Sequence, residues 1–169
     1  KIEKIEKEAG RIMETVASLL SFSRVRKDRK VTADLREVVE EVVTLVHHRA
    51  KEKEISLSTS LGEGPAPVQG EENKLKQVVM NLIMNSVEAV LRNGTVEIRL
   101  SSDSRERLYE LVIRDNGYGI PQDVASSIFE PFFSTKVTKK NTGLGLSISR
   151  NIVEDVGGSI DFESEPGAY

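Results

Sequence analysis

Two asparagines four residues apart, Asn81 and Asn85, have a type and a spacing that suggest chemistry. Side chains at i and i+4 lie one above the other on the same face of a helix. Asparagine forms helices poorly and is favoured in turns and caps, so a pair on one helical face needs a reason. Neutral carboxamide oxygens can coordinate Mg²⁺, which keeps several waters and bridges the phosphates of a substrate. The pair therefore suggests a site for Mg²⁺ and phosphates, with an ordinary solvated polar face as the alternative.

A carboxylate followed by two glycines ends a strand-like segment in the sequence Asp115-Asn116-Gly117-Tyr118-Gly119. The carboxylate can accept a hydrogen bond from an exocyclic amine such as that of adenine, and the glycines let a ring lie against the backbone. A common Asp-Asn-Gly turn explains the same residues without any ligand. The segment by itself leaves both interpretations open.

A second glycine pair, Gly143 and Gly145, opens directly into a segment of helical periodicity. Free N–H groups at a helix start and the positive end of the helix dipole favour phosphate oxygens, which glycine allows to approach closely. The segment matches neither the GxGxxG nor the GxxxxGK[ST] pattern, so those two nucleotide-binding folds are disfavoured. Lys136, Lys139 and Lys140 precede it and could reach phosphates, although such loop lysines are more often simply solvated.

An aromatic cluster, Phe129, Phe132 and Phe133, stands in a stretch of little periodicity between Pro121 and Asn141. We expect these rings to anchor the stretch to the core. Aromatic anchors on a glycine-flanked loop also suit a lid that orders over a ligand, and the two roles are compatible.

The elements that must position these residues follow from hydrophobic periodicity. Helices are expected at about 35–53, 73–91 and 144–156, strands at 31–32, 55–59, 95–101, 108–115 and 160–162, and a single helical turn near 124–128. Two adjacent strands joined by a short turn, among strands separated by helices, argue for a mixed sheet covered by helices. The expected fold class is a two-layer α/β (α+β) sandwich.

Residues 1–23 carry a narrow heptad pattern that predicts a helix of a coiled coil or four-helix bundle, with a helix lying on its own domain as the alternative. The charged run up to Lys30 is most simply a solvated linker. The expected domains are residues 1–24, a linker at 25–30, and residues 31–169. Both ends look cut, because the chain opens inside a helical pattern and stops just after a strand-like segment.

Composition excludes several classes of function. The net charge is −3 with 30% charged residues of both signs, so the overall field favours neither nucleic acid nor an anionic membrane surface. There is no cysteine and no apolar run near the ~20 residues that cross a bilayer. We expect a soluble, cytoplasmic fragment without nucleic-acid or membrane contact, and leave open whether a parent protein is anchored in a membrane.

Together, and in this order, the four segments resemble the N, G1, F and G2 boxes of the sensor histidine kinase ATP-binding domain. This is the Bergerat fold, shared with type II topoisomerases, a heat-shock chaperone and mismatch-repair ATPases. The resemblance covers residues 31–169 and implies a mixed sheet with about three helices on one face. It also implies that the chain binds ATP and Mg²⁺.

The resemblance implies a role for each segment. Asn85 would be the Mg²⁺ ligand, Asn81 would support metal and phosphates, and Lys136 would join them as a catalytic residue. Asp115 would read adenine, and residues 120–142 would form the ATP lid. The nucleotide-binding residues implied are Asn85, Asp115, Gly117, Gly119, Ile120, Phe132, Thr142, Gly143, Leu144, Gly145 and Leu146.

Asn81 also discriminates between members of the superfamily. By the resemblance, hydrolysing relatives and serine kinases of this fold carry Glu at this position, where it can take a proton. An amide cannot act as such a base, so Asn81 favours transfer to a nucleophilic imidazole. The alternatives are an ATP-gated conformational ATPase of the same superfamily and a nucleotide-independent dimerisation or binding module.

The family's phosphoacceptor motif, a histidine followed by an acidic residue and a nearby Asn/Thr-Pro, is absent. His47 and His48 do not match it and are expected on the surface. Residues 1–23 are similar to the second helix of the dimerisation and phosphotransfer hairpin, which implies a homodimeric parent with the acceptor histidine upstream. The parent would be a protein-histidine kinase that passes phosphate on to a response regulator receiver domain. The fragment itself is expected to bind nucleotide without autophosphorylating.

Overall fold

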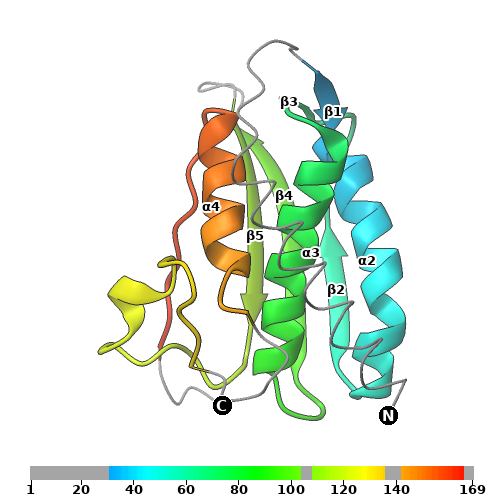
Figure 1. Cartoon of the computed structure of the whole chain (residues 1–169). Coiled ribbons are helices and arrows are strands. Elements are labelled where there is room, and N and C mark those ends of the chain that lie inside the picture. Colours follow the sequence, from blue (N-terminus) through cyan, green and yellow to red (C-terminus); the bar gives the residue numbers. More distant parts are fainter. Residues whose placement is uncertain (1–30, 104–107, 136–141, 166–169) are drawn as a thin grey trace, which may run out of the picture.

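The computed structural model describes residues 31–103, 108–135 and 142–165 (Figure 1). The predicted N-terminal helix and linker, residues 1–30, lie outside the described residues, and so does Lys136. The helices are α2 (Leu35–Glu52), α3 (Glu72–Ala89) and α4 (Gly145–Asp155), with a 3₁₀ turn η1 (Ala125–Ser127). The strands are β1 (Thr32–Asp34), β2 (Ser56–Ser60), β3 (Pro67–Gln69), β4 (Thr95–Asp103) and β5 (Leu108–Asp115).

The main sheet has the strand order β2-β4-β5 and is mixed. Strands β2 and β4 run parallel with Leu57 opposite Val96, and β4 and β5 run antiparallel with Ile98 opposite Ile113. The short strands β1 and β3 form a separate antiparallel pair. All three described helices lie on one face of the main sheet (Figure 1), so the predicted two-layer sandwich is confirmed.

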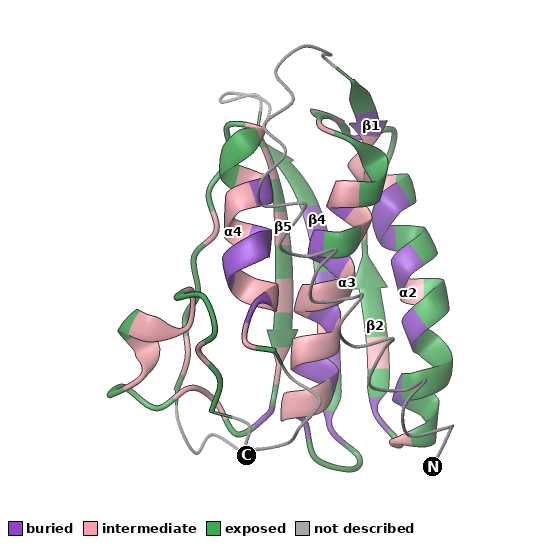
Figure 2. Cartoon of the chain, viewed as in Figure 1, coloured by how far each residue is buried: buried purple, intermediate pink, exposed green. Residues whose placement is uncertain are grey.

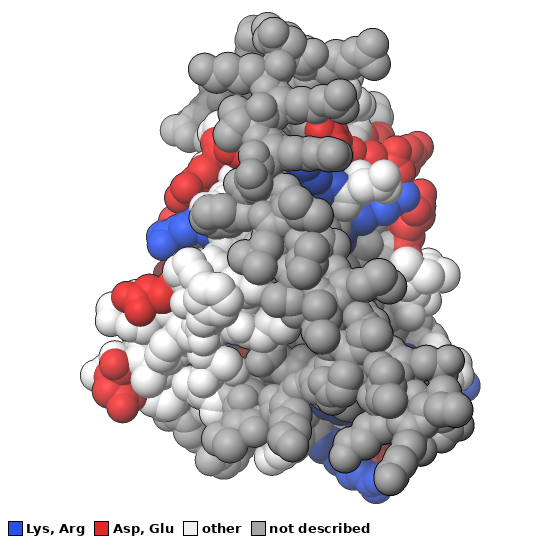
Figure 3. All heavy atoms as spheres, in the orientation of Figure 1, with Lys and Arg blue, Asp and Glu red and all other residues white. Residues whose placement is uncertain are grey.

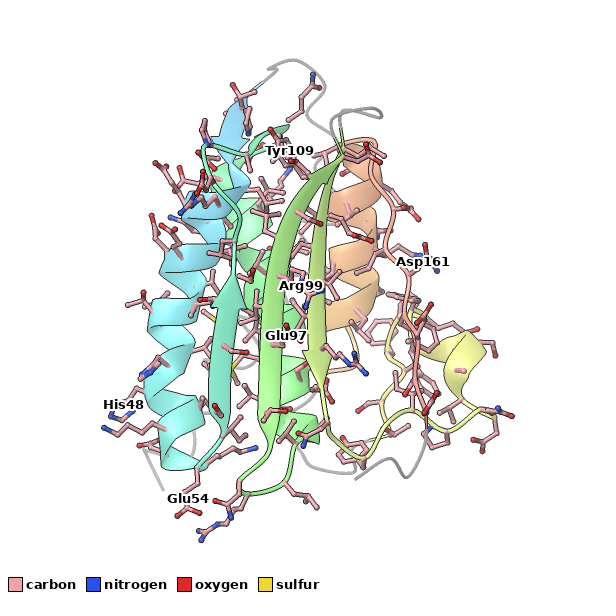
Figure 4. All side chains as sticks on the ribbon, turned by 180° about the vertical axis from the view of Figure 1, so that it is seen from behind. His48, Glu54, Glu97, Arg99, Tyr109 and Asp161 are labelled. Carbon is pink, nitrogen blue, oxygen red and sulfur yellow. The ribbon has the colours of Figure 1, made fainter. Side chains whose placement is uncertain are left out.

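The other face of the sheet carries polar side chains. Figure 4, seen from behind, shows Glu97 and Arg99 of β4 on this face, where Arg99 Nη2 lies 2.8 Å from Glu97 Oε1. Val96 and Ile98, which alternate with these two residues along β4, are fully buried because successive side chains of a strand point to opposite faces. The alternation of apolar and polar residues along β4 thus determines which of its faces the helices cover.

The main core fills the space between the sheet and the helices (Figure 2). Its fully buried members include Val96 and Ile98 of β4, and valines and isoleucine from the facing sides of two helices: Val38, Val39, Val42 and Val46 of α2, and Val79, Ile83 and Val87 of α3. Burying each such side chain contributes roughly 1.5–3 kcal/mol to the hydrophobic term. A second, smaller cluster of Val78, Leu144, Ile148 and Ile152 joins α3 to α4.

The two histidines of the chain lie exposed on α2, as predicted. His48 Nδ1 lies 3.6 Å from Glu52 Oε1 on the same helix. No helix in the described part of the chain combines the length and the apolar character that crossing a lipid bilayer requires.

The structure differs from the expected strands in two places. Residues 67–69 were not among the expected strands, but they form β3, which pairs with β1 from a distant part of the sequence. Residues 160–162 were expected to be a strand, but residues 158–165 form neither helix nor strand. This segment contacts the loop after β5 instead, since the Ile120 N–H donates to Ser164 Oγ at 2.7 Å. Side-chain alternation reports burial on one side, and cannot show whether a neighbouring strand is present.

Candidate functional site

One face of α3 organises the candidate site. Asn81, Asn85 and Ala89 follow one another at steps of four residues and share this face. At 1.5 Å per residue the face spans about 12 Å from the first to the last. Gly145 at the start of α4 contacts Asn81 at one end of the face, and Gly117 in the loop after β5 contacts Ala89 at the other.

Asn81 lies in the contact between α3 and α4. Its Nδ2 donates a hydrogen bond to Ser149 Oγ at 3.0 Å, and Ser149 is only 1% exposed. The backbone of Gly145 lies against the same carboxamide, because a Cβ added there would come within 2.9 Å of Asn81 Nδ2. The first asparagine of the pair is therefore held between two helices and is not a residue of a solvated surface.

Asn85 lies one turn further along α3 and is half-buried. Within the described residues its side chain makes no hydrogen bond, so its carboxamide oxygen is available to a ligand. The described residues contain no group of three His, Cys, Asp or Glu side chains that could hold a metal ion. A metal at Asn85 would thus have to complete its shell with water and ligand oxygens, and Mg²⁺ accepts such a shell. The donor set fits the ion that the sequence implied.

The start of α4 presents backbone donors without a side-chain cap. Leu144 is the N-cap residue, and within the described part of the chain no side chain caps the first N–H groups of the helix. Ser147 Oγ does not serve this purpose, because it donates to the Leu144 carbonyl at 2.9 Å. The first intrahelical bond runs from the Ile148 N–H to the same carbonyl. The amides of Gly145 and Leu146 therefore remain suitable for an anion such as phosphate.

The loop after β5 is clamped to the end of α3. A Cβ on Gly117 would lie 2.6 Å from the Ala89 carbonyl oxygen, so only glycine fits there, and the Tyr118 N–H donates to the same oxygen at 3.3 Å. Asp115 Oδ1 accepts from the Gly117 N–H at 3.0 Å, which is the turn that the sequence offered as the alternative to adenine binding. The carboxylate is half-buried and is oriented by this bond. A structural role and a ligand role for Asp115 are compatible, because a carboxylate has acceptor capacity beyond one hydrogen bond.

Asn116 has a structural role that the sequence did not reveal. Its Oδ1 accepts a hydrogen bond from the Thr95 N–H at 2.7 Å, and its own N–H donates to the Thr95 carbonyl at 3.3 Å. The side chain thus fixes the end of β5 to the start of β4. Asn116 is thus engaged in the sheet, whereas its neighbours Asp115 and Gly117 were predicted to bind nucleotide.

The phenylalanine segment contacts α4 and the chain that follows it. The Arg150 guanidinium lies 4.4 Å from the centre of the Phe129 ring, and Phe129 and Phe162 pack with ring centres 6.1 Å apart. The expectation that all three rings are anchors is wrong for Phe132, which is 66% exposed and has a φ of 67°. A positive φ is uncommon for a residue other than glycine. Figure 3 shows that the surface over this segment is largely uncharged, with isolated acidic side chains.

Gly143 connects this segment to the start of α4. It has a φ of +68°, and a Cβ on it would lie 2.6 Å from the Phe132 carbonyl oxygen. The positive φ and the close carbonyl both exclude other residues. The glycine pair at 143 and 145 therefore serves two contacts, one with the aromatic segment and one with α3.

The structure brings together most of the predicted residues. Asn81, Gly145, Gly143 and the Phe132 backbone form one continuous chain of contacts, and Asp115 with Gly117 forms the other end of the site. Thr142 is exposed and lies three residues before Gly145, the first residue of α4, whereas Lys136 lies outside the described residues. The sequence reasoning missed Ser149, Ala89 and Arg150. For Ser149 and Ala89 the only signal was position, since Ser149 follows Gly145 by four residues and Ala89 follows Asn85 by four.

Comparison with known proteins gives consistent matches. A family described as histidine kinase-, DNA gyrase B-, and HSP90-like ATPase matches residues 70–169. The chain is 37% identical over 163 residues to the sensor histidine kinase ZraS of Klebsiella oxytoca, covering 95% of the chain and 34% of that protein. It is 36% identical over 160 residues to sporulation kinase A of Bacillus subtilis (strain 168), covering 94% of the chain and 26% of that protein. The chain thus spans about a third or less of the length of these relatives.

Solved structures of a histidine kinase are also similar to this chain. The nucleotide-free catalytic domain of the histidine kinase ThkA matches with a TM-score of 0.67 at 30% identity, over 76% of this chain and 82% of that one. A structure of ThkA in complex with the response regulator protein TrrA matches with a TM-score of 0.70 at 28% identity, over 91% of this chain and 43% of that one.

Proposed function

The chain belongs to the family of histidine kinase-, DNA gyrase B- and HSP90-like ATPases, and on that premise we propose that it is the ATP- and Mg²⁺-binding catalytic domain of a two-component sensor histidine kinase. The observation that carries the proposal is the face of α3 on which Asn85 lies between the start of α4 and the loop that holds Asp115. One end of this face offers the Asp115 carboxylate and the other offers the uncapped amides of α4, and the base and the phosphates of a nucleotide require such different partners.

The adenine end of the site would be the loop after β5. Asp115 would accept a hydrogen bond from the exocyclic amine, while Gly117 and Gly119 leave room for the base against the backbone. Ile120, whose N–H is held by Ser164 Oγ, would contact the base at the beginning of the lid. The lid at residues 120–142 remains a prediction. The proposed role of the exposed Phe132 ring in this lid is also a prediction.

The phosphate end would be the start of α4. The uncapped amides of Gly145 and Leu146, together with the helix dipole, would hold phosphate oxygens, with Gly143, Leu144 and Thr142 lining the approach. Asn85 would direct its carboxamide oxygen at the metal ion, and Lys136 would add a positive charge near the phosphates. Mg²⁺, when bound, neutralises charge that develops on the transferring phosphoryl group.

Asn81 favours phosphoryl transfer over hydrolysis. A carboxamide cannot accept a proton from water, and in this chain the group is already engaged with Ser149. We infer that the γ-phosphate passes to a histidine of the parent protein and then to an aspartate of a response regulator. The sensor histidine kinase names of the relatives and the ThkA complex with the response regulator protein TrrA support a reaction of this class. Residues 1–24 would supply the homodimer contact in the parent.

Two measurements test the proposal. Titration calorimetry of this chain with ATP and Mg²⁺ should show binding to one site per chain, and absence of heat would favour a nucleotide-independent module. Incubation with γ-labelled ATP should leave the chain free of acid-labile phosphate, and should label a separately prepared fragment of the parent that carries the acceptor histidine. Label on this chain alone would contradict the proposal. Appreciable hydrolysis that Asn81→Ala abolishes would favour the conformational ATPase.

A further inference from the structure

A buried serine of α4, Ser149, contacts Asn81 of the candidate site. Ser149 is 1% exposed, follows Gly145 by one helical turn, and accepts a hydrogen bond from Asn81 Nδ2 at 3.0 Å. A hydroxyl buried in a contact between helices is costly unless it is hydrogen-bonded. The interaction with Asn81 meets that requirement across 68 positions of sequence.

The Asn81 carboxamide is held by two neighbours. Ser149 binds its nitrogen, and the backbone of Gly145 packs against the same group, with room for no Cβ. The last torsion of a free asparagine side chain has a broad, poorly defined preference. The two contacts together remove this freedom and fix the carboxamide relative to the start of α4.

We propose that Ser149 is a positioning residue for nucleotide binding, which orients the Asn81 carboxamide against the phosphate-binding start of α4. This inference rests on the proposed function. Ser149 is itself shielded from solvent and would not touch ATP, so it acts through Asn81.

A role in packing alone leads to a different expectation. The neighbouring contact between α3 and α4 is apolar and is made by Val78, Leu144, Ile148 and Ile152. If Ser149 only filled space beside this cluster, replacing it would change stability, and any effect on affinity would be independent of Asn81. The coupling between Ser149 and Asn81 in nucleotide affinity is therefore the quantity to measure.

A double-mutant cycle measures this coupling. Ser149→Ala, Asn81→Ala and the double variant are titrated with Mg-ATP by calorimetry, and their melting temperatures are recorded. We expect Ser149→Ala to weaken binding about three- to tenfold, the range of one net hydrogen bond. The double variant should bind as weakly as Asn81→Ala alone. Wild-type affinity for Ser149→Ala, or losses that multiply in the double variant, would overturn the inference.

Two further variants make the result decisive. Ile152 belongs to the apolar cluster in the same contact between helices, so Ile152→Val should lower the melting temperature and keep wild-type affinity. Ser149→Cys keeps the side-chain size and weakens the hydrogen bond, so it replaces Ser149→Ala if that variant does not fold, with the same expected loss. If the wild-type chain fails to bind Mg-ATP, the proposed function itself is wrong. If it binds and the coupling is absent, only the role of Ser149 is wrong.

Discussion

Gly145 at the start of α4 lies against the carboxamide of Asn81 in α3 with no room for a side chain between them. Gly145→Ala should therefore displace the Asn81 carboxamide from its hydrogen bond with Ser149 or push the two helices apart. We expect a loss of about 1–3 kcal/mol, typical of overpacking, and at least about tenfold weaker Mg-ATP binding. Thermal unfolding and calorimetry measure the two effects. The double variant Gly145→Ala with Asn81→Ala should recover most of the melting temperature, because it removes the colliding group, and no recovery would show that the strain lies elsewhere.

Asn85 should matter only when Mg²⁺ is present. Asn85→Ala removes the proposed metal ligand, so we expect Mg-ATP affinity to fall about tenfold or more while ATP affinity in excess EDTA changes little. Gln77→Ala, at an exposed position two turns earlier on α3, is the matched control and should bind like the wild type. Equal losses with and without Mg²⁺ would argue against a metal ligand at Asn85.

Asp115 and Asn116 are neighbours with different expected effects. Asp115→Asn can keep the oxygen that accepts from the Gly117 N–H, so folding should be preserved while affinity for ATP falls about tenfold or more. Asn116→Ala removes the acceptor of the Thr95 N–H in a solvent-exposed hydrogen bond and should cost about 0.5–1.5 kcal/mol of stability, with the smaller effect on affinity. Chemical denaturation and calorimetry on both variants test the contrast. A parallel loss of stability and affinity in Asp115→Asn would mean that its role is structural.

The Arg150 guanidinium over the Phe129 ring should stabilise the segment after β5. Arg150→Ala is expected to cost about 0.5–1 kcal/mol, the range for an exposed cation–π contact, and to speed proteolysis between residues 120 and 135. Arg150 also lies 3.5 Å from Glu154, so Glu154→Ala serves as the control. Because exposed ion pairs contribute little, this control should cleave at the wild-type rate. Faster cleavage in the control would assign the effect to the ion pair.

Lys76 links α2 to α3 and makes a pH-dependent contribution. Hydrogen bonds to Glu41 and then Glu72, each at 2.5 Å, raise the pKa of Lys76 above its usual value of 10.5. A raised pKa means that the stabilisation is complete below 10.5 and is lost as the pH rises through the folded-state value. The difference in melting temperature between wild type and Lys76→Gln should therefore be constant at neutral pH and shrink in strong alkali. A difference that grows with pH would contradict this sign.

Periodicity predicted the helices and four of the five strands well, because burial against one sheet face leaves a clear pattern along α2, α3 and β4. It failed for β3, whose existence depends on pairing with β1, and for residues 160–162, which pack against a loop. These outcomes depend on distant partners that no local pattern reports.

The candidate site was likewise predicted only in part from local sequence. Residue type was enough to select Asn81, Asp115 and the glycines, since each is unusual where it stands. The residues that hold them in place, Ser149 and Ala89, are ordinary in type and owe their importance to what they touch. Only the assembled helices reveal them.

Because α3 is a continuous helix, it fixes the distance between the two ends of the site. Asn81 and Ala89, which make the contacts at the two ends, are joined by unbroken helix, so a shift of one contact along the helix also shifts the other. One inserted residue between Asn85 and Ala89 would rotate the far end by about 100° and advance it by about 1.5 Å, and would turn Ala89 away from Gly117. Changes of chain length that surface loops tolerate are therefore expected to be forbidden in these two turns of helix.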